Sequence, residues 1–163
     1  MVTIAKRDFS YLGESPANIE IAIGDARLNL EREPRQEFDV LAVDAFSSDS
    51  IPVHLITDEA VAIYMKHMKA DGVVAFHVSN RFLDLKPVLE KIAQKQGLHV
   101  AWVHEDKAGE DGASRTTSDW VLLAKNKTFL LRDPIVDATF VIDPQPGWRL
   151  WTDDFNNLFQ VLK

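Results

Sequence analysis

The sequence contains no cysteine, and it lacks the short motifs that commonly hold nucleotides or metals. Without a thiol, the chain of 163 residues can form no disulfide, no cysteine nucleophile and no thiolate metal ligand. No Gly-x-Gly is present to build a glycine-rich phosphate turn, and GxxxxGK[ST], GxSxG and HExxH are also missing. The histidines lack metal-ligand spacing, so we expect no metal site. We interpret all of them as surface or packing residues: His54, His67, His77, His99 and His104.

Long apolar runs are missing as well. No segment approaches the roughly 18 apolar residues of a membrane-spanning helix, and residues 1–15 lack the apolar stretch of a signal peptide. The 25 acidic residues outnumber the 18 Lys and Arg, which gives a formal net charge of -7. This balance argues against non-specific binding to nucleic acid or to an anionic membrane, and it suits a cationic ligand or simple solubility. We therefore expect a cytoplasmic protein without nucleic-acid or membrane partners.

What the sequence does contain is an alternation of short apolar runs and segments of helical period. This alternation predicts an α/β domain with a mostly parallel sheet. A hydrophobic content of 46% and the length of the chain suit one globular domain. Strands are predicted at residues 18–25, 38–46, 72–80, 99–105 and 119–126.

Two helices are predicted between these strands. Residues 58–69 follow Thr57, a good N-cap, and carry acidic residues in the first turn and basic residues in the last, which suits the helix dipole. Residues 85–96 place apolar side chains on one face and stop at Gly97. We expect both helices to pack against the sheet.

The connection over 106–118 is polar and contains glycine, so we expect it to be mobile. We expect one domain over 1–163, with a helix or linker over 1–17, an α/β core over 18–126 and a docked tail over 127–163. The apolar residues expected to dock the tail are Trp148, Trp151, Phe155, Leu158, Phe159 and Leu162.

Carboxylates follow two of the predicted strands. Asp25 ends the first strand, Asp44 ends the apolar part of the second, and Asp49 lies in the loop beyond it. In open α/β sheets ligands bind outside the carboxyl ends of the strands. A carboxylate placed there can bind an amine or hydroxyl, or take a proton as a general base. The simpler alternative is that Asp25 and Asp44 only cap the turns after their strands, with Asp49 in solvent.

The segments "GDARLNLER" and "FDVLAVDAFSSDSIPVHLIT" resemble the carboxyl-side half of the polyamine aminopropyltransferases, the spermidine synthases. The resemblance covers residues 18–125, and the ending "WTDDFNNLF" is also similar. It implies a partial Rossmann-like, class I methyltransferase-like fold. The expected sheet is mostly parallel, lacks the first two strands of that fold and has a terminal antiparallel strand.

The resemblance also implies roles for individual residues. Asp25 and Ala26 match the dipeptide that contacts the adenine amino group of decarboxylated S-adenosylmethionine, and Pro52 matches a proline that packs near the adenine. Asp44 matches the general base that deprotonates a putrescine-type amine. Asp49 matches an aspartate that holds the acceptor. No tightly bound cofactor is implied, because decarboxylated S-adenosylmethionine is a cosubstrate.

The sequence departs from the family pattern in two places. The typical loop is a compact Asp-Ser-Ser-Asp, whereas Ala45 and Phe46 intervene here. The family's glycine-rich turn and amino-terminal hairpin domain are expected upstream of Met1. A sheet that lacks its first two strands leaves an apolar central strand as an edge, which favours association. We therefore expect a homodimer, or a partner chain that supplies the missing half.

Three functions remain open from the sequence. The first is aminopropyl transfer from decarboxylated S-adenosylmethionine to a small amine such as putrescine, incomplete in this chain alone. The second is an S-adenosylmethionine-dependent methyltransferase-like protein on the same fold. The third is a non-catalytic module that dimerises.

Overall fold

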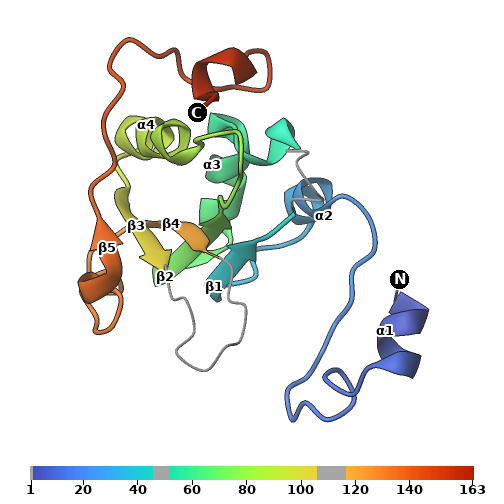
Figure 1. Ribbon diagram of the computed structural model, residues 1–163. Coiled ribbons are helices and arrows are strands. Elements are labelled where there is room, and N and C mark those ends of the chain that lie inside the picture. The colour runs from blue at the N-terminus through green and yellow to red at the C-terminus, as the bar shows by residue number, and fades with distance from the viewer. Residues whose placement is uncertain (1, 46–51, 106–116) are drawn as a thin grey trace.

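The computed structural model describes residues 2–45, 52–105 and 117–163. A five-stranded sheet with the order β1-β2-β4-β3-β5 forms the centre of the molecule (Figure 1). The strands are β1 (Phe38–Val43), β2 (Met68–His77), β3 (His99–Glu105), β4 (Ser118–Ala124) and β5 (Thr139–Phe140). The α-helices are α1 (Val2–Asp8), α2 (Ala26–Arg32), α3 (Asp58–Lys66) and α4 (Lys86–Gln96). Short 3₁₀ turns are η1 (Val53–Leu55), η2 (Val136–Ala138) and η3 (Leu158–Val161).

Strand direction in the sheet agrees with the predicted fold class, although most neighbouring pairs are antiparallel. β1 pairs with β2 in parallel, and β4 pairs antiparallel with both β2 and β3. β1, β2 and β3 therefore run in one direction. The reversed strand β4 lies between β2 and β3, so both of its pairings are antiparallel. The pairing of β3 with β5 is the third antiparallel pair. The result is an α/β sheet with its long strands mostly codirectional and one reversed strand inside it.

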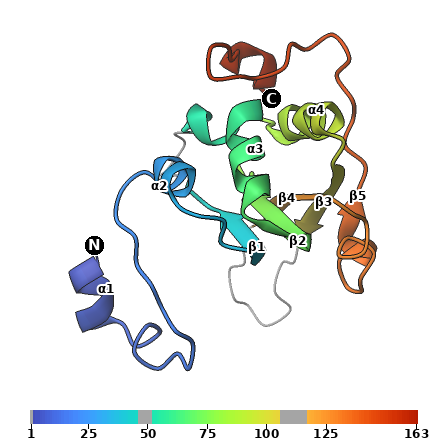
Figure 2. The same ribbon diagram turned by 180° about the vertical axis from the view of Figure 1, so that it is seen from behind.

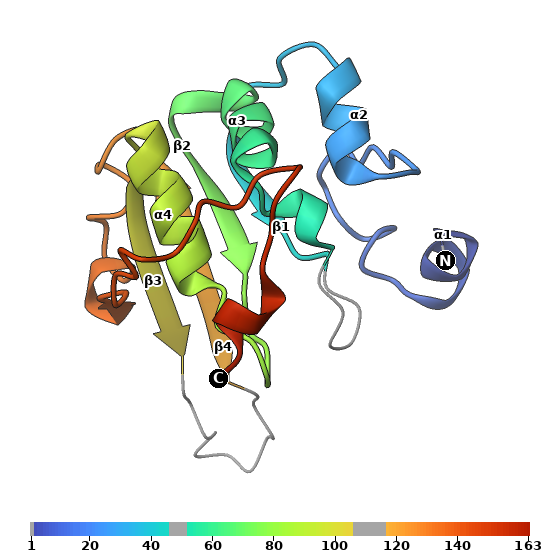
Figure 3. The same cartoon turned by 90° about the horizontal axis from the view of Figure 1, so that it is seen from above.

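Helices α3 and α4 lie side by side over one face of the sheet (Figure 3). The largest apolar cluster fills the space between them and the strands, with Tyr64, Phe76, Leu89 and Ile92 almost completely buried. The opposite face of the sheet carries a smaller cluster in which Leu122 packs with residues 129–135 of the tail. The core is therefore thick on the helical face and thin on the other.

Local sequence explains how α3 and β2 begin. The Thr57 hydroxyl accepts a hydrogen bond from the Ala60 amide and caps α3. The helix predicted over 58–69 ends at Lys66 in the structure, because the chain enters β2 at Met68. Within β2, Gly72 allows β1 to approach closely, since a Cβ there would lie 2.7 Å from the Phe38 carbonyl oxygen. Helix α4 ends at Gly97, whose φ of 65° suits glycine.

The predicted strand over 18–25 is wrong. This segment is extended but pairs with no strand among the described residues, and Ile19, Ile21 and Ile23 are 41%, 41% and 81% exposed. The alternation of isoleucines is a valid strand pattern, but a strand needs a neighbour to satisfy its backbone groups. The segment instead leads into α2, a helix that periodicity did not reveal.

The tail over 127–163 runs back across the molecule to α4 and α3 (Figure 1). Trp151 is buried, and its carbonyl accepts a hydrogen bond from the Asp58 amide at the start of α3. Phe159 and Leu162, which were also expected to dock, are 85% and 57% exposed. The buried apolar side chains that dock the tail are Leu130, Ile142, Trp151 and Val161.

The amino-terminal segment lies to one side of the sheet (Figure 2). Helix α1 buries none of its residues. No helix in the described part of the chain is long and apolar enough to cross a membrane. Most of the predicted mobile connection, residues 106–116, falls outside the described residues.

Candidate functional site

The carboxyl ends of β1 and β2 bring Asp44 and His77 together. β1 and β2 are parallel neighbours with Val43 opposite Phe76, so the residues that follow these two lie at the same edge of the sheet. Asp44 Oδ1 lies 2.8 Å from His77 Nδ1. The His77 ring stacks on Trp120, with the ring centroids 4.8 Å apart. The imidazole is therefore held between a carboxylate and an indole.

This pair leaves part of the Asp44 carboxylate free. The side chain of Asp44 is 57% exposed, and within the described residues its Oδ2 has no hydrogen bond. When Nδ1 of His77 carries a proton it donates to Oδ1, which fixes the orientation of the carboxylate. The free oxygen can then accept a proton or bind an ammonium group from the solvent side.

Asp25 lies at the amino end of α2 and has both oxygens engaged. Its Oδ1 accepts the Leu28 amide at 2.9 Å, as an N-cap does, and its Oδ2 lies 2.8 Å from His54 Nε2. The hydrogen bond from the Leu28 amide is the main cause that lowers the pKa of Asp25, and the bond to His54 adds to it. Asp25 is therefore an ionised cap whose remaining lone pairs face solvent.

A small cavity of about 190 Å³ lies between α2 and the end of β1. It contains Asp44 and Ala26, two of the residues singled out from the sequence. The described residues that line it are Ala26, Leu30, Leu41, Ala42, Val43, Asp44, Ala45, Leu55 and Tyr64. Tyr64 donates its hydroxyl proton to the Leu55 carbonyl oxygen, and burial raises the pKa of this phenol, so it stays neutral. Among the described residues that line the cavity, Asp44 is the one carboxylate on a largely apolar wall.

Arg27 ties this wall to the tail of the protein. Its guanidinium donates to both carboxylate oxygens of Asp153, at 2.7 and 2.5 Å, and to the His54 carbonyl oxygen at 2.7 Å. Thr57 donates its hydroxyl proton to the same Asp153 at 2.8 Å. The Arg27 guanidinium lowers the pKa of Asp153, and burial of the carboxyl opposes this more weakly. We call the group Arg27, Asp153 and Thr57 the latch, because it joins α2, α3 and the tail beside the cavity.

Two of the residues expected at the site remain apart from this geometry. Asp49 lies outside the described residues, and its role stays a prediction. Pro52 precedes η1, and its carbonyl oxygen accepts the Leu55 amide, so it touches the cavity only through Leu55. The structure thus places Asp44 and Ala26 on one cavity, with Asp25 beside it through Ala26.

His54 and His77 were missed as members of the site. Both are partly exposed, which agrees with their interpretation as surface residues, but each contacts a carboxylate that the sequence had singled out. The available signal for His77 was its position at the end of the apolar run "GVVAFH", which places it at the same sheet edge as Asp44. His54 offered no comparable signal, because its contact with Asp25 depends on the path of the chain into α3.

No protein-family model and no curated protein matches this sequence. Among solved structures, spermidine synthase from Thermotoga maritima aligns with 94% of this chain and 50% of its own, with a TM-score of 0.51 and 17% sequence identity. MNMC2 from Aquifex aeolicus aligns with 71% of this chain and 35% of its own, with a TM-score of 0.46 and 17% identity. The chain spans half or less of the length of these two proteins. The similarity to spermidine synthase shows the fold alone, a class I methyltransferase-like fold.

Proposed function

We propose that this chain is an aminopropyltransferase-like protein that works on decarboxylated S-adenosylmethionine and a small amine such as putrescine. The observation that supports this most is the place of Asp44, at the carboxyl end of β1 on the wall of the cavity that also contains Ala26. The local sequence around Asp25 and Asp44 resembles that of spermidine synthases, and the fold is compatible with the same chemistry.

The reaction needs a base and no acid. The acceptor amine is protonated in water, and the free oxygen of Asp44 takes one proton from it. The nitrogen lone pair then attacks the methylene carbon beside the sulfonium, and the carbon–sulfur bond breaks. Its electron pair stays on sulfur, which leaves as the neutral thioether of methylthioadenosine. His77 holds Asp44 through the 2.8 Å contact and so orients the base.

The adenine side of the site involves α2 in this proposal. Asp25 accepts a hydrogen bond from the adenine amino group, using lone pairs that Leu28 and His54 leave free. Ala26 and Pro52 form an apolar contact with the base. Asp49 binds the distal ammonium group of the acceptor.

The site is incomplete in a single copy of this chain. Its cavity of about 190 Å³ falls below the roughly 300–1,000 Å³ of ordinary ligand pockets. β1 is an edge strand in the described sheet, and Val40 on it is 53% exposed. We propose that a second copy, or a partner chain, covers this edge and supplies the other wall of the pocket.

A calorimetric titration tests the proposal. Methylthioadenosine and decarboxylated S-adenosylmethionine should bind in the micromolar range to the associated form of the chain, and Asp25→Asn should weaken both. Binding of S-adenosylmethionine without its decarboxylated form would instead favour a methyltransferase-like protein. Absence of binding at about 1 mM ligand by every oligomeric form would contradict the proposal.

A non-catalytic dimerising module is the second candidate, and the exposed edge of β1 favours it. Such a module would associate through β1 but bind none of these nucleosides. Light scattering and calorimetry on the same sample separate the two, because only the enzyme links association to ligand affinity.

A further inference from the structure

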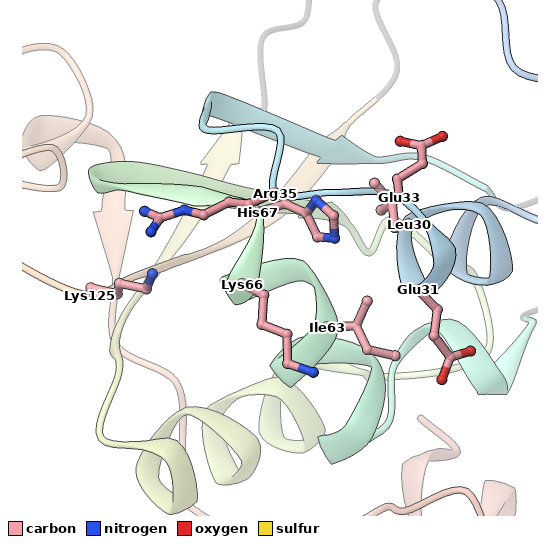
Figure 4. A pocket seen from close by; sticks show the side chains of 8 residues that line it. All are labelled: Leu30, Glu31, Glu33, Arg35, Ile63, Lys66, His67 and Lys125. Atoms are coloured by element: carbon pink, nitrogen blue, oxygen red, sulfur yellow. The ribbon is translucent and has the colours of Figure 1, made fainter.

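A second and larger cavity lies at the opposite end of the sheet, away from Asp44. It has a volume of about 470 Å³. His67 immediately precedes β2, and Lys125 follows the end of the reversed strand β4, so both lie where the codirectional strands begin. Residues 33–37 lead from α2 to β1 at the same end. The lining is Leu30, Glu31, Glu33, Arg35, Ile63, Lys66, His67 and Lys125 (Figure 4).

Positive charge gathers on one side of this cavity, with Glu37 as its one carboxylate partner among the described residues. Arg35 Nη2 and Lys125 Nζ both donate to one neutral acceptor, the Met68 carbonyl oxygen, at 3.2 and 3.5 Å. Arg35 has one carboxylate nearby, Glu37, at 3.8 Å and with both side chains mostly exposed. Lys66, on α3, makes no hydrogen bond or ion pair with the described residues. Two cations that share a single carbonyl repel one another, and an anion between them relieves that repulsion.

His67 supplies an independent sign of a missing polar partner. The residue is 3% exposed, and its Nδ1 is buried without a hydrogen bond in the described part of the chain. Its position is fixed, because its amide donates to the Tyr64 carbonyl, its own carbonyl accepts from the Phe38 amide and its ring stacks on Phe38. Buried polar side-chain atoms in proteins nearly always have a partner. The His67 ring lines the cavity, so its nitrogen signals report on a ligand bound there.

The opposite side of the cavity is acidic. Figure 4 shows Arg35 and Lys125 on one side and the carboxylates of Glu31 and Glu33 across from them, with Lys66 between. Leu30 and Ile63 add apolar surface. A plain inorganic anion would use only the basic side, whereas a molecule with an anionic group at one end and hydroxyl or amino groups at the other would use both.

We propose that this cavity binds a small organic phosphate that carries hydroxyl or amino groups. The phosphate lies against Arg35 and Lys125, and the donor groups of the ligand reach Glu31 and Glu33 across the cavity. Phosphate suits the basic side because its several oxygens can accept from an arginine fork and from a lysine at once. This site is separate from the one around Asp44 and does not depend on the proposed transferase activity.

Glycerol 3-phosphate, inorganic phosphate and glycerol are the probes for this site, titrated at constant ionic strength. Calorimetry gives affinities, and the imidazole nitrogen signals of His67 in NMR spectra locate the ligand. We expect glycerol 3-phosphate to bind more tightly than inorganic phosphate and glycerol not to bind. Arg35→Gln and Lys125→Gln should each weaken binding about tenfold, the loss expected for one charge-assisted contact. Lys91→Gln, on α4 and bonded only to the Pro146 carbonyl, is the matched change of charge and should leave binding unchanged.

Two results would overturn the proposal. One is the absence of saturable binding of glycerol 3-phosphate up to about 50 mM, which corresponds to almost no affinity. The other is an equal loss in Lys91→Gln and in the two cavity variants, which would mean a general effect of charge.

Discussion

The two sides of β1 differ more than any other neighbouring regions of the molecule. Toward β2, the chain is packed on α3 and α4, and Val74, Phe76 and Ile92 are fully buried. Away from β2, Val40 is half exposed and the isoleucines of segment 18–25 contact solvent. Apolar residues are thus buried on the β2 side of β1 and exposed on its other side. The difference shows that the packed core of the described chain does not extend to the exposed side of β1.

A matched pair of isoleucine truncations tests the comparison with the largest expected effect. Ile92→Ala should lower the free energy of unfolding by about 3 kcal/mol, because it opens a cavity in a fully buried position. Ile23→Ala, at a residue 81% exposed, should change it by less than about 0.5 kcal/mol. Urea unfolding at low protein concentration measures both. Similar losses in the two variants would mean that segment 18–25 is part of the folded core.

A substitution in the latch should lower the free energy of unfolding by less than Ile92→Ala does and by more than Ile23→Ala does. Arg27→Gln removes the bonds to Asp153 and to the His54 carbonyl, and we expect a loss of about 1–2 kcal/mol in unfolding free energy. Arg32→Gln, at the exposed end of the same helix, is the matched control and should be nearly neutral. Equal stability of the two variants would show that the latch does not contribute to the stability of the fold.

Acid should remove the contribution of the latch. The pKa of Asp153 is lower in the folded protein than its ordinary value, chiefly because of Arg27, so the ionised carboxylate stabilises the fold above that ordinary value. This contribution is lost as the pH falls below about 4 and protonates the group. The difference in unfolding free energy between wild type and Arg27→Gln should therefore shrink from pH 7 to about pH 3. A difference that stays constant over this range would argue against the charge pairing.

Val40→Lys should change the free energy of unfolding very little, and it should strongly reduce association. A lysine on an exposed edge strand opposes pairing with another strand but costs little in the monomer. We expect light scattering to show association of the wild-type chain and its loss in Val40→Lys, with nearly unchanged urea unfolding. A wild-type chain that stays monomeric at every concentration would leave a partner chain, and not a second copy, to complete the site.

Much of the packed side could be predicted from the sequence. Strand β3 lies where alternation placed it, α3 starts after its expected cap Thr57, and α4 ends at Gly97 as expected, because local pattern and tertiary packing agree there. Segment 18–25 has an equally good strand pattern, but no strand among the described residues pairs with it. Pattern alone could not distinguish these two cases, since pairing is not a local property.

The site was predictable in part. Asp44 and Asp25 could be singled out because they follow apolar runs, and Ala26 because it adjoins Asp25. The contact between Asp44 and His77 follows from the parallel register of β1 and β2, which residue spacing does not reveal. The cavity around His67 combines residues of α2 and α3 with residues of the connections next to β1, β2 and β4, so no local motif marks it.

The most direct test of the central claim is the rate of methylthioadenosine formation from decarboxylated S-adenosylmethionine and putrescine, followed by mass spectrometry in the associated form of the protein. Asp44→Asn should reduce this rate at least about 100-fold, the scale of general-base catalysis, while its unfolding free energy stays close to wild type. Asp39→Asn, on the same strand and bonded to Lys69, is the matched control and should keep the rate. Equal rates in Asp44→Asn and wild type, or no product together with no binding of the cosubstrate, would contradict the account.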